Sequence, residues 1–259
     1  MSPSPRRSET LIDLRGGFPR AGLVQRQAAL QGIARNTQAI WSVDFTQSLE
    51  HVVTSLLSIA SPELEWTDLH SLPLTDRHAM VRAVWLLDGG GPARAEAECH
   101  ECGEWVEFEL DLRSIPVPGG CDVLTVHRNE EERACCLPTP LVTEAANDGV
   151  DVAAACLQCS REEAEPWVDA VEEALSQNDL LGEILLVGPC VSCGRTLQTE
   201  FDLKSAWAAW MRGIVRRLMA DVHTLARNYH WSEDEILRIP EARRAVYLNF
   251  CDVEEPVEA

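Results

Sequence analysis

The stretch CHECGEWVEFELDL, Cys99 to Leu112, returns in altered form ninety-one positions later as CVSCGRTLQTEFDL, Cys190 to Leu203. Six positions agree at the same offsets: both cysteines, the glycine after the second cysteine, a glutamate, and the closing aspartate and leucine. After each glycine, apolar and polar residues alternate loosely, which is typical of a short strand. The repeat therefore predicts two equivalent cysteine turns, each leading into a strand.

A Cys-x-x-Cys turn places two sulfur atoms on one side of a tight loop. A following glycine can adopt the left-handed conformation that lets backbone N–H groups point at those sulfurs. Two such turns that face each other complete a tetrahedral Cys₄ zinc site, which is the arrangement of a zinc ribbon. We therefore predict one structural Zn²⁺, with four ligands from the two turns: Cys99, Cys102, Cys190 and Cys193.

The two halves of this site lie much farther apart in the chain than those of a compact ribbon. The cost of closing a loop grows only logarithmically with its length, so the long insertion is compatible with a shared site. Two other interpretations stay open, namely two unrelated pairs of reduced cysteines or two redox-active pairs. A thioredoxin-like pair is expected at a helix N-terminus, whereas these turns lead into strand patterns.

A third Cys-x-x-Cys, Cys156 and Cys159, lies in the run DVAAACLQCSREEA, which is typical of a helix. One interpretation is that these cysteines are small core residues. The other is a second metal site shared with the neighbouring pair Cys135 and Cys136. Cys121 and Cys251 are expected to be structural.

Composition excludes several classes of protein. The formal net charge of −20 opposes binding to a phosphate backbone, so we expect no nucleic-acid partner. No apolar run follows MSPSPRR, and none approaches the roughly 20 residues of a membrane span, so we expect neither a signal peptide nor a membrane. Ten cysteines in such a chain indicate a reducing cytoplasm and metal ligands or core residues rather than disulfides.

The chain divides into three segments by composition. Residues 1–40 are rich in arginine, proline, serine and glycine and predict a flexible arm, which is solvated, docks on an acidic partner or folds back on the body of this protein. Residues 41–250 predict a single α+β domain, a mostly helical body with a zinc-ribbon-like β element whose halves lie near 99–112 and 190–203. Residues 251–259 form an acidic tail.

Apolar spacing predicts the helices of this body. They are expected from Asp44 to Ala60, from an N-cap at Thr75 to Leu87, and along a long stripe over 207–229. Ser232 and Glu235 have capping-box spacing, and Pro240 begins a further helix. The insertion between the cysteine turns is expected to hold strands near 121–126 and 133–139, helices over 152–159 and 162–176, and an apolar strand over 184–188.

Motifs of catalysis are missing from the sequence. It contains no HExxH, GxSxG, P-loop or GxGxxG, and a zinc ion with four cysteine ligands keeps no open position for water. His223 and His230 lie seven residues apart on the long helix, a spacing that could hold a metal, but we expect them to be packing residues. The sequence therefore predicts a protein that is not an enzyme and has no small-molecule substrate.

The C-terminal run RRLMADVHTLARNYHWSEDEILRIPEARRAVYL, Arg216 to Leu248, resembles the T-even phage-type baseplate hub assembly chaperone family of contractile tails and related injection systems. The likeness lies in the D-V-H-x-L-A-R-x-Y core and the following W-S-E-x-E-I-L. Many relatives also resemble this chain in having two CxxCG turns, the second before an F-D-L segment. The likeness extends more weakly over 44–250, and the matching motif positions are Asp221, His223, Arg227, Tyr229 and Trp231.

The resemblance implies a non-enzymatic baseplate component or assembly chaperone of a contractile phage tail or phage tail-like injection system. Its partners would be hub, wedge or spike proteins. The protein would then act in the cytoplasm of the producing bacterium or be incorporated in the particle. The alternative from another class is a zinc-ribbon adaptor in transcription or protein quality control.

Overall fold

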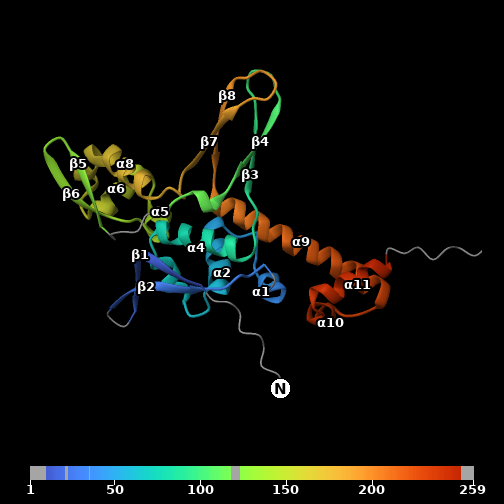
Figure 1. The fold of residues 1–259 in the computed structure, drawn as a ribbon. Coiled ribbons are helices and arrows are strands. Elements are labelled where there is room, and N and C mark those ends of the chain that lie inside the picture. Colours follow the sequence, from blue (N-terminus) through green and yellow to red (C-terminus); the bar gives the residue numbers. More distant parts are fainter. Residues whose placement is uncertain (1–9, 21–22, 35, 118–122, 252–259) are drawn as a thin grey trace, which may run out of the picture.

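The computed structural model describes residues 10–20, 23–34, 36–117 and 123–251. The fold is α+β, with about half of the chain helical and the strands paired in small antiparallel hairpins. Figure 1 shows a central helical body, a pair of hairpins that rises from it, an insertion on one side and a helical C-terminal unit on the other. None of the helices in the described ranges is long and apolar enough to cross a membrane.

The helices of the body bury one continuous apolar core. The apolar stripe predicted from Asp44 forms α2, which starts later than expected because the Ser48 side chain caps it by accepting a hydrogen bond from the His51 N–H. Thr75 was expected as an N-cap and is instead a buried residue inside a helix that begins at Leu74. The helices of the body are α1 (Thr37–Trp41), α2 (Leu49–Ala60), α3 (Trp66–Ser71), α4 (Leu74–Leu87) and the start of α9 (Leu203–Tyr229).

The described part of the arm predicted over 1–40 is not a solvated extension, because it folds back on the body, which is one of the alternatives that the sequence left open. Strands β1 (Thr10–Arg20) and β2 (Leu23–Leu30) form a hairpin that packs on α3 and α4 and contributes buried side chains to the core, among them Phe18 and Leu30. The arginines obscured this strand pattern, in which Leu14, Phe18, Ala28 and Leu30 are buried. Residues 1–9 and most of the acidic tail, residues 252–259, lie outside the described ranges.

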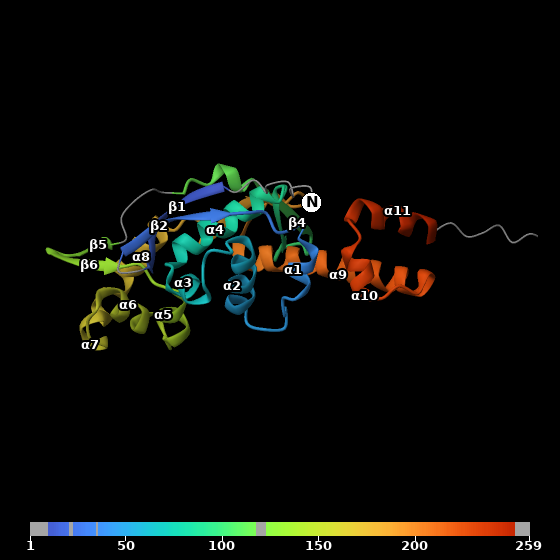
Figure 2. The ribbon, with the colours of Figure 1, turned by 90° about the horizontal axis from the view of Figure 1, so that it is seen from below.

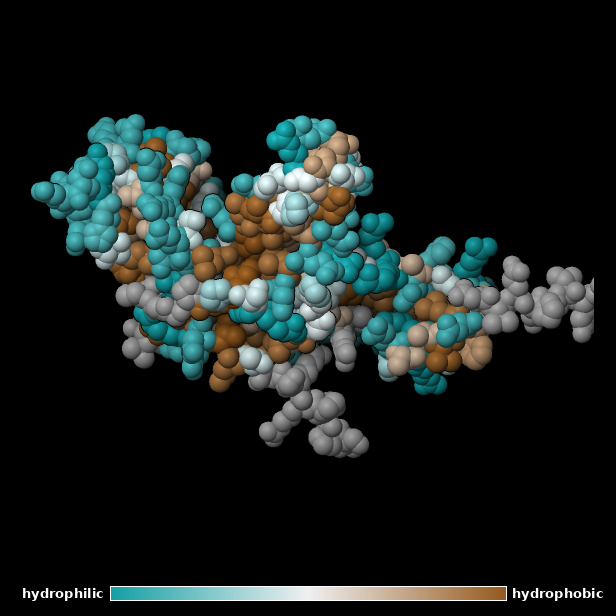
Figure 3. Space-filling view, turned by 45° about the horizontal axis from the view of Figure 1, so that its top comes forward, coloured by the Kyte–Doolittle hydropathy of each residue, from teal (hydrophilic) through white to brown (hydrophobic). Residues whose placement is uncertain are grey.

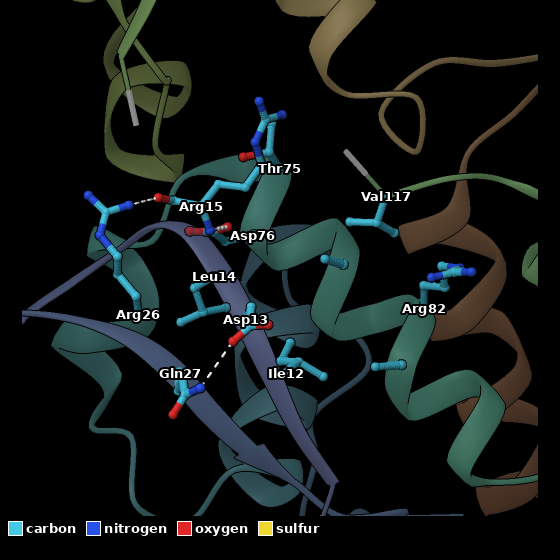
Figure 4. Close-up of a pocket in the computed structure, with 12 residues that line it drawn as sticks. Ile12, Asp13, Leu14, Arg15, Arg26, Gln27, Thr75, Asp76, Arg82 and Val117 are labelled. Carbon is cyan, nitrogen blue, oxygen red and sulfur yellow. Dashed lines mark hydrogen bonds between the residues drawn. The ribbon is translucent and has the colours of Figure 1, made fainter. Parts of the chain in front are cut away.

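A single carboxylate fixes this hairpin to α4. Asp76 accepts the backbone N–H groups of Arg15, Gly16 and Gly17 at 2.5, 2.9 and 2.8 Å. Figure 4 shows Asp76 next to Arg15. Both residues line a cavity of about 680 Å³ between β1 and α4. The Arg26 guanidinium donates to the backbone oxygen of Arg15, which braces the second strand against the first.

A buried ion-pair network connects four helices of the body. The Arg77 guanidinium on α4 donates to the Leu69 backbone oxygen at 3.0 Å, to Thr54 at 2.9 Å and to Glu50 at 3.0 Å. The other carboxylate oxygen of Glu50 binds Lys204 at the start of α9. Because the Arg77 side chain is fully buried, these partners are required to offset its desolvation.

The insertion has an apolar core of its own, so the single domain expected over 41–250 has a separately packed part. Strands β5 (Val123–Arg128) and β6 (Glu131–Cys136) form a hairpin against α6 and α8, around the buried ring of Trp167. The insertion contacts the body where His78 meets Asp179 at 2.7 Å. Its helices are α5 (Pro140–Ala145), α6 (Gly149–Leu157), α7 (Arg161–Ala164) and α8 (Val168–Asn178), with a 3₁₀ turn at Glu165–Trp167.

The C-terminal unit lies at the far end of α9. Helices α10 (Glu233–Arg238) and α11 (Glu241–Cys251) fold back on the last turns of α9, and both views of the ribbon place this unit away from the insertion (Figures 1 and 2). The rings of Tyr229 and Trp231 stack at 4.6 Å, and both meet the edge of Tyr247. The predicted capping box of Ser232 and Glu235 is confirmed.

Candidate metal centre

The repeat seen in the sequence is a repeat of whole hairpins. Strands β3 (Ala93–Glu98) and β4 (Trp105–Leu110) pair around the first cysteine turn, and β7 (Ile184–Pro189) and β8 (Thr196–Phe201) pair around the second. Every strand boundary recurs at the same offset of ninety-one residues, and the buried and exposed positions of β3 and β7 alternate identically. Strand β3 was not predicted, although its alternation of alanine with charged residues has the period of a strand.

The two turns have the same hydrogen bonds. In the first, the Cys99 N–H donates to the Glu104 oxygen at 2.8 Å and the Gly103 N–H donates to the Cys99 oxygen at 2.8 Å. In the second, the equivalent bonds are 2.7 and 2.9 Å long and join Cys190 to Arg195 and Gly194. Both glycines have a φ of +73°, as the sequence predicted, because this turn requires the left-handed region.

The closing Asp-Leu of each copy also has a structural role that was not predicted from the sequence. Asp111 accepts the Arg113 N–H at the start of the 3₁₀ turn Leu112–Ser114, and Asp202 caps α9 by accepting from Lys204 and Ser205. The leucine after each aspartate is 1% exposed and anchors its hairpin in the core of the body. Each hairpin is thus fixed at its base.

The four predicted ligand sulfurs lie together at the tip of the paired hairpins. Cys99 Sγ is 3.7 Å from Cys193 Sγ, and Cys102 Sγ is 3.6 Å from Cys190 Sγ. All four sulfurs lie within 4.8 Å of one another, so the group could hold a metal ion. The first cysteine of each turn is buried with Val106 and Leu197, whereas the second is exposed.

The electrostatics of the cluster favour a bound cation. Backbone N–H groups of Cys193 and Ser192 lower the pKa of Cys190 to about 7. The backbone N–H of Glu104 also favours the Cys102 thiolate, but desolvation and the neighbouring thiols outweigh it and raise the pKa of Cys102 to about 12. Four thiolates at these distances repel one another, and a bound metal cation would remove that repulsion.

The second set of cysteines lies in the core of the insertion. Cys135 on β6 and Cys156 on α6 are buried, and a hydrogen bond between their thiols raises the pKa of Cys156 and lowers that of Cys135. Cys136 and Cys159 are half-buried, with Gln158 donating to the Cys136 sulfur at 3.2 Å. Within the described residues this set does not gather into a metal-binding group, which favours the interpretation as core residues.

The histidines of the long helix are not packing residues, so that expectation is wrong. His223 is exposed, and His230 is exposed at the left-handed residue that ends α9. Of the motif positions near them, Arg227 is also exposed, whereas Asp221 is half-buried and its burial raises its pKa. Residues 221–230 belong to the last part of α9 and its end, and this part of the helix lies away from the paired hairpins (Figure 1).

Comparison with known proteins gives no further guide to the site. No family model, curated protein or solved structure matches this chain.

Proposed function

We propose that the paired hairpins form a split zinc ribbon and that their four cysteines bind one structural Zn²⁺. A regular tetrahedron with zinc–sulfur bonds of about 2.3 Å has sulfur–sulfur edges of about 3.8 Å. Two of the sulfur–sulfur distances, 3.7 and 3.6 Å, are close to that edge and far from the about 2.05 Å of a disulfide. An all-thiolate tetrahedral set is also a ligand set that zinc favours.

The ribbon serves a non-enzymatic protein that builds the baseplate or its central hub in a contractile phage tail or related injection system. The observation that carries this proposal is the likeness of residues 216–248 to the baseplate hub assembly chaperone family. Two features of the C-terminal unit support it. The unit lies at one end of the molecule (Figure 2), and it exposes apolar side chains together with motif residues.

Exposed apolar groups on this unit indicate a surface that binds another protein. Met219, Val246 and Phe250 are 53%, 50% and 64% exposed. Arg227 and His223 are exposed on the same end of α9, and arginine is enriched at protein interfaces. The contacts among Tyr229, Trp231 and Tyr247 join the end of α9 to α11.

Affinity purification from cells that produce contractile tails tests the proposal. The tagged protein is expected to recover hub, wedge or spike proteins, and Arg227→Ala is expected to weaken that recovery. Arg216→Ala is the matched control, because Arg216 is exposed on the same helix outside the D-V-H-x-L-A-R-x-Y core. Recovery of transcription or protein quality-control machinery instead would support the adaptor alternative and refute the baseplate function.

A further inference from the structure

The two hairpins pack against each other with approximate twofold symmetry. β3 lies beside β8, and β7 lies beside β4, so each half supplies an equivalent strand to each side. On the β7 and β4 side the ring of Phe108 fills the space over Gly188, where an added Cβ would come within 3.0 Å of the ring. The equivalent positions on the β3 and β8 side are Ala97 and Thr199, which are at the same ninety-one-residue offset.

Thr199 therefore stands where the other half has Phe108, and its smaller side chain leaves the β3 and β8 side of the paired hairpins open. A groove of about 500 Å³ runs between β3 and β8 where the ring is missing. Its floor is apolar, with the half-buried Ala97 and the buried Leu197. Residues of both strands and the first turn line it: Glu96, Ala97, Glu98, His100, Trp105, Thr196, Leu197, Gln198 and Thr199.

The wall of the groove formed by β3 and its neighbour carries uncompensated negative charge. Glu96 lies directly opposite Glu107 in the hairpin, a pairing of like charges that destabilises a sheet. Arg94 is 3.2 Å from Glu107 and 2.9 Å from Glu109, so its charge is already paired. Within the described residues, the side chains of Glu96 and Glu98 form no hydrogen bond or ion pair. A cation in the groove would pair with the carboxylates of Glu96 and Glu98.

Trp105 stands at the same wall with 60% of its surface exposed. Its register partner is Glu98, so the ring and the carboxylate lie on the same face of the hairpin. A cation over a tryptophan ring is attracted by the ring face, and a nearby carboxylate adds a charge-assisted hydrogen bond. Trp105 and the unpaired carboxylates of Glu96 and Glu98 are therefore suited to bind a cationic group, and the apolar floor of the groove is suited to an aliphatic stem attached to it.

We propose that the groove between β3 and β8 binds an arginine side chain from an extended segment of a partner protein. The aliphatic stem would cover Ala97 and Leu197 in the place that Phe108 fills on the other side. The guanidinium would lie between Trp105 and the carboxylates of Glu96 and Glu98, since arginine combines stacking with bidentate pairing. This inference rests on the geometry of the hairpins and is independent of the baseplate function.

Binding of a model peptide to the full-length protein tests this proposal. The probe is the blocked pentapeptide Ala-Ala-Arg-Ala-Ala, compared with the same peptide carrying citrulline, the neutral isostere of arginine. Backbone amide shifts in nuclear magnetic resonance spectra locate the peptide and give its affinity. We expect the arginine peptide to shift amides of β3 and β8 and to bind at least about tenfold more tightly than the citrulline peptide.

Three variants separate a groove from general attraction to an acidic protein. Thr199→Phe places on the open side the ring that Phe108 supplies on the other, and it leaves the charge unchanged. The double variant E96Q/E98Q keeps the shape and removes the charge. Both are expected to weaken arginine binding about tenfold or more, whereas E109Q/E200Q, which removes two equivalent glutamates outside the groove, is expected to stay within about twofold.

Several results would overturn the proposal. Equal affinity of the arginine and citrulline peptides would exclude recognition of the charge. Equal weakening by E109Q/E200Q and E96Q/E98Q would assign the binding to the overall charge of −20. If T199F disturbs folding, the comparison of the two glutamine variants still distinguishes binding in the groove from general electrostatic attraction to an acidic protein.

Discussion

The backbone conformation of each cysteine turn explains why it ends in a glycine, Gly103 in the first turn and Gly194 in the second. Both have a φ of +73°, where a side chain costs about 1 to 2 kcal/mol because Cβ approaches the carbonyl oxygen. A Cβ added at Gly194 would meet no atom within 4 Å, so this cost is purely conformational. The left-handed residue turns the chain into the second strand and holds the following N–H groups near the sulfurs.

Gly194→Ala is therefore expected to lower the free energy of unfolding by about 1 to 2 kcal/mol and to weaken metal retention. Chemical denaturation and competition with a chelator measure the two effects. Gly91→Ala is the matched control, since its Cβ also meets no atom within 4 Å and Gly91 is not among the glycines with positive φ. Equal destabilisation by both substitutions would contradict the conformational explanation.

Glu50 has a different kind of importance, because it compensates a fully buried guanidinium. Glu50→Gln is expected to cost about 3 kcal/mol of stability by leaving the Arg77 charge unpaired in the core. Asp234→Asn is the control at an exposed pair, where Arg238 and Asp234 are 3.8 Å apart and the expected cost is below about 1 kcal/mol. Comparable losses from the two variants would refute the structural importance of the network.

The same carboxylate predicts a pH dependence. Burial raises the pKa of Glu50, but the hydrogen bonds and charges of Lys204 and Arg77 outweigh burial and place its pKa below the ordinary value. Since the folded state binds the proton less tightly than the unfolded state, the stabilisation is present above about pH 4.3 and is lost as the pH falls further. Denaturation between pH 3 and pH 7 should show the difference between wild type and E50Q shrinking at acidic pH.

Among the elements, the hairpin of β1 and β2 differs most from the structure expected from the sequence. Its arginines were expected to be solvated, yet Arg15 is 8% exposed and donates to the Asn178 backbone oxygen at 2.5 Å, which connects the hairpin to the end of α8. Phe18 is 2% exposed in the core of the body. The hairpin therefore belongs to the folded body and joins it to the insertion.

Phe18→Ala is expected to destabilise the protein by about 3 to 5 kcal/mol through loss of burial and the cavity left behind. Val24→Ala on the same hairpin is the control, because Val24 is 54% exposed and its truncation should cost less than about 0.5 kcal/mol. Thermal denaturation of both variants measures the two losses of stability. If the Phe18→Ala protein melts at the same temperature as the wild type, the hairpin is not packed in the core, and the interpretation of residues 1–40 as a solvated arm would be supported instead.

Helices with a long apolar stripe or a capping motif could be predicted from the sequence, whereas strands β1, β2 and β3 could not. The stripe over 207–229 and the capping box at Ser232 gave α9 and α10 because local spacing and capping chemistry determine them. The four clustered cysteines could be predicted because the same Cys-x-x-Cys-Gly pattern occurs twice in the sequence, which indicates two equivalent turns. The β1 hairpin, the role of the Asp-Leu pairs and the groove beside Thr199 depend on contacts between distant segments, which one sequence does not display.

In the whole molecule, the two cysteine turns flank the insertion and meet above the body. A metal held by all four sulfurs would join the start and end of that long segment and keep Leu112 and Leu203 at matching positions in the core. Figure 3 shows hydrophilic residues at the tip of the hairpins and apolar residues lower down, toward the body. Removal of the metal is therefore expected to loosen the hairpins while the core of the body persists.

Zinc content per polypeptide, measured by elemental analysis of the purified full-length protein and three serine variants, tests the shared metal site most directly. The four-cysteine geometry predicts one equivalent of zinc in the wild type and in Cys156→Ser, whose sulfur lies in the core of the insertion. Cys99→Ser and Cys190→Ser should lose zinc to a similar extent, because each removes one of four ligands from a single site. A wild-type protein without zinc, or a Cys190→Ser protein that retains a full equivalent, would contradict the shared site.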